Sequence, residues 1–229
     1  MLFIKVIMLD ISVQRHSQII SYRFTSDPPQ TPYCPQWDYI IAEKTIDIDV
    51  EELTNLILSK RHKTLPNAQG DILLLNPLKW NYPVCKNLLN EIKKFHKEYV
   101  KNTFPEFDSK LKVRCWCIIM DKGQHFSPHF HSIKGTSYLS GHFTVKCDGS
   151  STNYRTPYEL NYHYPIKNVP NVISLFPTCI VHNTTPHQGD SERITIAFDL
   201  ILENTPLDHL QSFADDNNSH NNENELIFI

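Results

Sequence analysis

The sequence lacks an excess of charge of either sign. Its 22 lysines and arginines nearly balance 25 acidic residues, and the formal net charge is -3 with histidine counted as neutral. A protein that binds nucleic acid through its phosphates normally carries a broad basic surface. No nucleic-acid partner is therefore indicated.

The sequence also lacks a cysteine pattern and a long apolar run. Its 6 cysteines are scattered, and no disulfide framework or zinc-ribbon spacing appears. The opening "MLFIKVIML" is interrupted by Lys5, is too short to cross a bilayer and is followed by no small-residue cleavage site. We therefore expect a cytoplasmic protein with no membrane partner. Nothing in the sequence indicates an oligomeric state.

What is present suits a single domain, because 229 residues can fold around one core. We predict one domain over residues 1–211. Within it, residues 1–112 form strands and helices that buttress a β-barrel at 113–205. Residues 212–229 are rich in Asn and acidic residues, which predicts a disordered tail whose final "LIFI" is apolar enough to dock.

Two stretches of the N-terminal half have a helical apolar period. One runs from about Val50 to Arg61, with Asp49 as the N-cap and Glu52 three residues later. The other follows Pro83, and charged residues fill its opposite face. Apolar residues recur in it at steps of three and four: Val84, Leu88, Ile92, Phe95 and Tyr99.

From about Val113 the period changes to that of strands. The runs "VRCWCIIM", "SYLSGHFTVKC", "YELNYHYP", "VISLFP" and "RITIAFDLIL" are β-branched or aromatic and are separated by Gly, Pro, Asn and Ser. These runs predict a sandwich or barrel. The polar "DGSSTNYRTP" (148–157) is predicted to be a loop between two strands that could cover a site at the barrel mouth.

Two histidines stand two residues apart in "SPHFHSIKG": His129 and His131. Residues at this spacing in an extended segment point to the same side, so the two imidazoles can converge on one point. Imidazole binds iron, copper, nickel and zinc. Alone the pair is weak evidence, because the chain has 12 histidines and histidines at a strand edge are often only hydrogen-bonded.

A third histidine, His182, strengthens the metal interpretation by its position. It follows the strand-like "VISLFP" and precedes Arg193 by eleven positions (193 − 182). A guanidinium near a metal is suited to hold a carboxylate by two hydrogen bonds, and Thr195 on the same strand face can add a third. The alternative for Arg193 is a surface ion pair with Glu192 or Asp190.

The order of these residues resembles that of the iron(II)/2-oxoglutarate-dependent oxygenases. The resemblance covers Trp116 to Asp199 and is carried by "KGQHFSPHFHSIKGTSYLSGHF" and, more specifically, by "FPTCIVHNTTPHQGDSERITIAFD". It implies an α+β chain that is mainly β, with flanking helices and an N-terminal extension around a double-stranded β-helix, the jelly-roll core that cupins share. The N-terminal half matches only in its general order of strands and helices.

The resemblance also implies a ligand set and a reaction. His129 and His182 would bind Fe(II), with His131 as the third ligand, and Arg193 and Thr195 would hold the distal carboxylate of 2-oxoglutarate. The implied cofactors are Fe(II), 2-oxoglutarate and O2. The implied reaction oxidises a C–H bond of a small-molecule substrate and releases succinate and CO2.

The sequence departs from the wider family at one ligand. Most members place a carboxylate two residues after the first histidine, and this chain has His131 there. Either three histidines bind the metal, or His131 lies behind the ligands and a carboxylate such as Asp121 or Asp148 completes the site.

Two other functions remain open from the sequence. Thiol dioxygenases share the fold, use three histidines and need no keto acid; a non-catalytic ligand-binding β-barrel is the other alternative. Arg193 and Thr195 favour the keto-acid enzyme over a thiol dioxygenase, whereas the absent carboxylate ligand favours the thiol dioxygenase. The substrate, and the choice between hydroxylation, desaturation, cyclisation and halogenation, cannot be read from the sequence, because one fold hosts many reactions.

Overall fold

The computed structural model describes residues 10–16, 18–26, 36–61, 69–73, 76–108, 110–131, 138–156, 163–205 and 227–228. This part of the chain is mainly β, as predicted, with helices α1 (Val50–Ser59) and α2 (Pro83–Thr103) and a short 3-10 turn, η1 (Pro77–Lys79). No helix in these ranges is long and apolar enough to span a bilayer.

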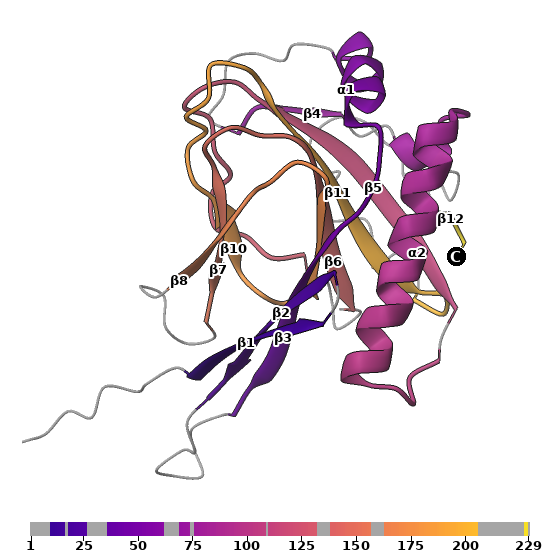
Figure 1. The fold of residues 1–229 in the computed structure, drawn as a ribbon, viewed down its shortest axis with the longest axis vertical. Helices are drawn as coiled ribbons and strands as arrows, with labels where there is room; N and C mark the ends of the chain where they lie inside the picture. The colour runs from indigo at the N-terminus through magenta and orange to yellow at the C-terminus, as the bar shows by residue number, and fades with distance from the viewer. Residues whose placement is uncertain are drawn as a thin grey trace, which may run out of the picture.

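Two antiparallel sheets form the barrel (Figure 1). The large sheet has the order β1-β2-β3-β9-β6-β11-β5-β12, with β4 also paired to β5, and the small sheet has the order β10-β7-β8. The large-sheet strands are β1 (Asp10–His16), β2 (Ile19–Thr25), β3 (Asp38–Thr45), β4 (Asp71–Leu73), β5 (Leu111–Met120), β6 (Leu139–Lys146), β9 (Val172–Pro177), β11 (Arg193–Leu202) and β12 (Ile227–Phe228). The small-sheet strands are β7 (Ser151–Arg155), β8 (His163–Lys167) and β10 (His182–Thr184).

The central strand β11 is buried on both faces, and its two faces differ in chemistry. Ile194, Ile196, Phe198 and Leu200 belong to the main hydrophobic core. Arg193, Thr195 and Asp199 alternate with them and therefore point to the opposite side, between the two sheets. The apolar face packs against the helices, and the polar face lines the interior of the barrel.

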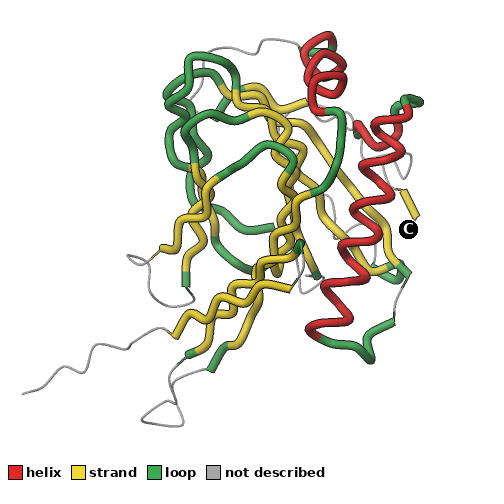
Figure 2. Tube along the Cα trace, in the orientation of Figure 1, coloured by secondary structure: helices red, strands yellow, loops and turns green. Residues whose placement is uncertain are grey.

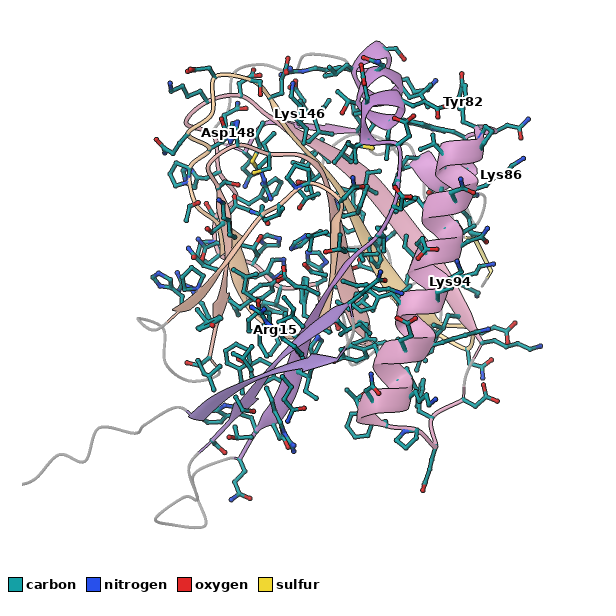
Figure 3. All side chains as sticks on the ribbon, viewed as in Figure 1. Arg15, Tyr82, Lys86, Lys94, Lys146 and Asp148 are labelled. Carbon is teal, nitrogen blue, oxygen red and sulfur yellow. The ribbon has the colours of Figure 1, made fainter. Side chains whose placement is uncertain are left out.

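Both helices cover the outer face of the large sheet (Figure 2). In α1 the predicted cap is present, because the Glu52 amide donates to Asp49 Oδ1 at 2.9 Å. In α2 the predicted apolar face is buried in the main core and comprises Val84, Leu88, Ile92, Phe95 and Tyr99. Lys86 and Lys94 lie on its exposed face and project away from the sheet (Figure 3).

One glycine of the barrel is required by close packing. A Cβ at Gly141 of β6 would lie 2.4 Å from the Phe198 ring and 2.4 Å from the Ser174 carbonyl oxygen. The large sheet can therefore bring β9, β6 and β11 together only with glycine at this position.

The C-terminal tail is described only at its end. Ile227 and Phe228 pair antiparallel with Val113 and Lys112 of β5, so part of "LIFI" adds an edge strand to the large sheet. The remainder of the predicted tail, residues 212–226 and 229, lies outside the described residues.

A mostly buried carboxylate inside the barrel wall should make stability depend on pH. Glu43 accepts hydrogen bonds from Tyr22 Oη at 3.1 Å and Ser174 Oγ at 3.3 Å, and burial raises its pKa to about 7. The unfolded chain releases this proton near pH 4.5, whereas the folded state keeps it up to about pH 7. The free energy of unfolding therefore falls as the pH rises from about 4.5 to about 7.

We expect the wild type to lose roughly 2–3 kcal/mol more stability than Glu43→Gln between pH 5 and pH 8. Urea unfolding of both proteins at the two pH values measures this difference, and comparing the two cancels the other titrating groups. Parallel pH profiles would show that Glu43 ionises normally.

Candidate metal centre

Backbone pairing brings His129 and His182 together across a large sequence separation. The His129 amide donates to the His182 carbonyl at 3.0 Å, and the His182 amide donates back at 2.9 Å. This isolated bridge places the His129 segment beside β10, at the edge of the small sheet. The two side chains therefore emerge from directly opposed residues.

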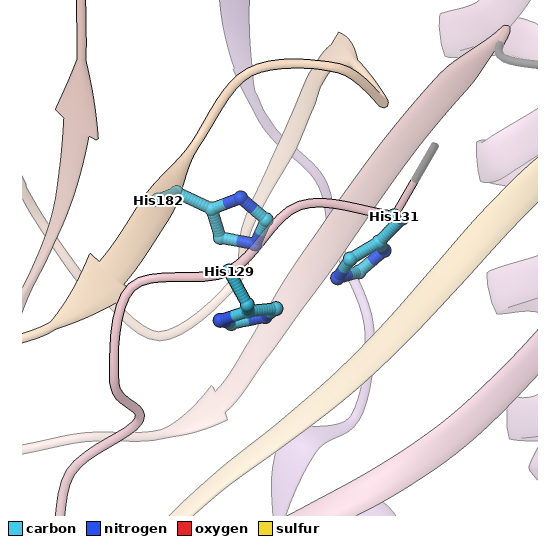
Figure 4. Close-up of side chains that lie close together, drawn as sticks. All are labelled: His129, His131 and His182. Atoms are coloured by element: carbon cyan, nitrogen blue, oxygen red, sulfur yellow. The ribbon is translucent and has the colours of Figure 1, made fainter. Parts of the chain in front are cut away.

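His131 joins the pair from the same segment. Its amide donates to the Thr178 carbonyl at 2.9 Å, which keeps the segment extended. The ring centroids lie 4.4 Å apart for His129 and His182, 5.2 Å for His129 and His131, and 5.0 Å for His131 and His182. One nitrogen from each ring lies within 4.8 Å of the others, and the three rings lie side by side (Figure 4).

Each imidazole is oriented through its Nδ1 atom. Nδ1 lies 2.8 Å from the Ser127 carbonyl in His129, 3.0 Å from the Ile180 carbonyl in His182, and 2.7 Å from Asp199 Oδ1 in His131. Carbonyl and carboxylate oxygens only accept, so each Nδ1 carries the proton and donates it. Nε2 is then the nitrogen of each ring that can bind a metal.

The electrostatics of the cluster favour neutral imidazoles. Burial lowers the pKa of His129, and it lowers the pKa of His182 still further, with the other two histidines adding to the effect on His182. A histidine must be unprotonated at one nitrogen to bind a metal. At neutral pH these two rings are therefore in the form that a metal requires.

Asp199 supports His131 from behind. Its Oδ1 accepts from His131 Nδ1 and, at 2.6 Å, from Ser140 Oγ. Its Oδ2 accepts from Arg114 Nη2, also at 2.6 Å. Burial alone would raise the pKa of Asp199, but His131 and Arg114 hold it well below its usual range. Asp199 is therefore an ionised carboxylate in the barrel interior.

Arg193 is a buried cation inside the barrel. It is 3% exposed, and its Nη1 atom donates a hydrogen bond to Met120 Sδ at 3.2 Å. Its Nε atom and the nearby Thr195 Oγ1 are both buried without a hydrogen-bond partner. No carboxylate of the described residues pairs with Arg193, so the surface ion pair with Glu192 or Asp190 is not formed. Glu192 instead pairs with Lys146 at 3.1 Å.

Further polar side chains are buried in the same interior. His142 of β6 and Tyr154 of β7 are joined by a hydrogen bond of 3.1 Å between Nε2 and Oη. Burial lowers the pKa of His142 to about 3, with a smaller contribution from the Arg193 charge. His142 Nδ1, like Arg193 Nε and Thr195 Oγ1, is buried without a partner. Together these groups form a polar interior that suits an anionic ligand.

Neither carboxylate considered as an alternative third ligand reaches the imidazoles. Asp121 accepts from Arg61 Nη2 at 2.9 Å, and Asp148 is exposed in the loop between β6 and β7 (Figure 3). The group of described residues able to hold a metal at this site consists of the three histidines.

Comparison with known proteins identifies the fold. No protein-family profile matches the sequence, and no curated protein sequence does. SnoK, an alpha ketoglutarate dependent carbocyclase from nogalamycin biosynthesis, matches with a TM-score of 0.57 at 10% identity, over 82% of this chain and 91% of SnoK. A Pseudomonas putida prolyl-4-hydroxylase matches with a TM-score of 0.56 at 11% identity, over 71% and 92% of the two chains.

The epimerase SnoN, also from nogalamycin biosynthesis, has a TM-score of 0.52 at 13% identity, over 69% of this chain and 76% of SnoN. The chain has the fold of the 2-oxoglutarate oxygenases. The predicted double-stranded β-helix is therefore confirmed. Identities this low establish the fold of an oxygenase but not its reaction.

One strand of this fold lies where a loop was predicted. Residues 148–157 were predicted to be a loop, which is wrong, because β7 occupies Ser151–Arg155 and pairs with both β8 and β10. Thr152 and Tyr154 of this strand face a polar interior, and Asn153, on the opposite face, is buried as well. The alternation of apolar and polar residues that marks a strand is therefore absent.

Asp199, Ser140 and Arg114 were also missed as parts of the site. Asp199 is the acidic residue inside the apolar run "RITIAFDLIL". A charged residue in a buried strand normally needs a partner, and this signal could have indicated it.

Proposed function

We propose that the chain is an iron(II)- and 2-oxoglutarate-dependent oxygenase that oxidises a small molecule and releases succinate and CO2. The observation that carries this proposal is the combination, within one barrel, of three converging imidazoles and a buried arginine with no acidic partner among the described residues. The fold supports the same class. The small-molecule substrate is a prediction, in line with the likeness to SnoK.

The donor set fits a first-row divalent metal. Three Nε2 atoms with fixed tautomers provide a face of nitrogen ligands, and imidazole suits Fe(II) among other metals. His129, His131 and His182 would hold the ion. When bound, iron together with 2-oxoglutarate supplies the activation of O2.

The polar interior fits the keto acid. Arg193 would hold its distal carboxylate through the two-pronged contact that a guanidinium makes, and Thr195 Oγ1 would donate a further hydrogen bond. His142 and Tyr154 lie in the same interior and add polar groups to its wall. Binding would neutralise the buried charge of Arg193 and give partners to the unpaired polar atoms.

Aromatic side chains surround the imidazoles and limit access of water. Trp116 lies 5.6 Å from His131, Phe126 lies 5.4 Å from His129, and Phe176 lies 4.8 Å from His182, measured between ring centroids. Excluding water protects a reactive oxidant from side reactions. The chain's own contributions are thus to orient the ligands, bind the anion and keep the site dry.

A thiol dioxygenase is the second candidate, and the three-histidine set favours it. Such an enzyme binds its substrate thiolate directly and has no need of a keto acid. It would leave the burial of Arg193 without an explanation, and we therefore rank it second. A non-catalytic barrel would leave both the histidine cluster and Arg193 unexplained.

Succinate formation tests the proposal. Protein prepared without oxygen and loaded with Fe(II) should convert 2-oxoglutarate slowly to succinate once O2 is admitted, even without the true substrate. The control is the same protein loaded with Zn(II), which has no redox chemistry and should form none. Oxygen uptake that depends on cysteine or cysteamine and ignores 2-oxoglutarate would overturn the proposal and establish the second candidate.

A further inference from the structure

The His131–Asp199 pair is buried, and further hydrogen bonds to Asp199 hold it in place. The two side chains are 5% and 4% exposed, and Asp199 Oδ1 accepts from both His131 and Ser140. Asp199 lies opposite Ser140 on β6 and opposite Arg114 on β5. Neighbours on both sides of a central strand therefore hold its carboxylate in a fixed place behind the imidazole.

The same pair stands where the chain departs from the oxygenase pattern. A carboxylate two residues after the first histidine would bring one negative charge to the metal, and His131 brings none. Asp199 places a carboxylate on the far nitrogen of that histidine, 2.7 Å from Nδ1, and Arg114 pairs with the other carboxylate oxygen at 2.6 Å. A carboxylate in this position fixes the tautomer and makes the opposite nitrogen a stronger ligand.

We propose that Asp199 supplies, through His131, the negative charge that the missing carboxylate ligand would have brought to the metal. Asp199 is a positioning residue: it acts on the metal through the imidazole and does not bind the ion. This inference rests on the proposed function, because it concerns the same metal centre.

The alternative is that Asp199 serves the fold alone, as the partner of Arg114. An Arg–Asp pair between neighbouring strands would be satisfied without His131. The two possibilities differ in what happens when the charge is removed and the shape is kept. The Asp199→Asn variant removes the charge and keeps an oxygen that can accept from His131 Nδ1, but its amide nitrogen cannot accept the hydrogen bond from Arg114.

The first measurement is the affinity for cobalt(II) alone, followed by visible absorption and by competition with a chelator of known affinity. We expect Asp199→Asn to bind cobalt(II) about 10 to 100-fold more weakly than the wild type. The matched control is Asp71→Asn, which removes another buried carboxylate paired to an arginine, Arg61, at 2.6 Å. It should bind cobalt(II) like the wild type.

The second measurement is a double-mutant cycle with His131→Asp. The His131→Asp variant brings a carboxylate charge of its own to the metal, and it has no Nδ1–H to donate to Asp199. Asp199→Asn should therefore cost roughly tenfold or more in cobalt(II) affinity in the wild-type background, and less than about threefold in the His131→Asp background.

The midpoint potential of bound iron is a third readout, and losing the carboxylate should move it in the positive direction.

Unchanged cobalt(II) affinity and iron potential in Asp199→Asn would overturn the inference, and so would an equal loss of affinity in the wild-type and His131→Asp backgrounds. Either result leaves the proposed function standing. Failure of the wild type to bind cobalt(II) would instead overturn the proposed function itself, so the two failures are distinguishable.

Discussion

Replacing His182 by alanine should abolish the binding of a first-row divalent metal. His182 is buried, its Nδ1 is held by the Ile180 carbonyl, and it is paired through the backbone with His129. Removing it leaves two ligands from one segment, which cannot close around an ion as three fixed ligands do. His129→Ala should have the same effect. Metal analysis after dialysis, on protein without a polyhistidine tag, measures the occupancy.

The matched control is His163→Ala, which removes an exposed histidine of β8. Its metal content should equal that of the wild type, at one ion per chain. Full occupancy in His182→Ala would place the metal elsewhere and remove the basis of the proposed function.

Local sequence patterns located both helices and the strands β5, β6, β8, β9 and β11. The strands β9 and β11 match the quoted runs "VISLFP" and "RITIAFDLIL" to the residue, because buried β-branched segments bounded by polar residues are distinctive. Helix α2 was predicted from its spacing of three and four, and α1 from its cap at Asp49. The strand β7 was missed because its inward side chains serve a polar interior, which removes the apolar alternation.

The candidate site was only partly predictable, because its geometry depends on contacts between distant segments. The spacing of His129 and His131 indicated convergence, but the bridge to His182 depends on how β10 pairs across the barrel. The support from Asp199 likewise depends on the register of β11 against β5 and β6. Local sequence carries no information on such register. The order of the motifs and the family resemblance related the three histidines to one another, and neither pointed to Asp199.

Replacing Arg193 should affect the stability of the protein and its keto-acid binding in opposite directions. A buried cation without a counter-charge destabilises the folded state, because it has lost its hydration and gained no anionic partner among the described residues. We expect Arg193→Met to raise the stability of the ligand-free protein by about 1–4 kcal/mol. The same variant should no longer be stabilised by 2-oxoglutarate, because the group that binds its distal carboxylate is gone.

Arg193→Lys should give an intermediate result. It keeps a positive charge but cannot reproduce the two-pronged contact with a carboxylate, so keto-acid binding should weaken markedly while metal affinity barely changes. Thermal unfolding without oxygen, in the presence of Fe(II) and increasing 2-oxoglutarate, reports both effects. The wild type should gain about 2.7 kcal/mol at 100 times the dissociation constant, and Arg193→Met should gain nothing.

Arg61 provides a control for the predicted rise in stability of Arg193→Met, because Arg61 has acidic partners. Arg61 is largely buried but pairs with Asp71 and Asp121 at 2.6 and 2.9 Å. Arg61→Met leaves the buried Asp71 carboxylate without this partner and should therefore lower stability, the reverse of Arg193→Met. If Arg193→Met also lowers stability, or if 2-oxoglutarate still stabilises it as much as the wild type, Arg193 is a structural residue and the keto acid does not bind at this position.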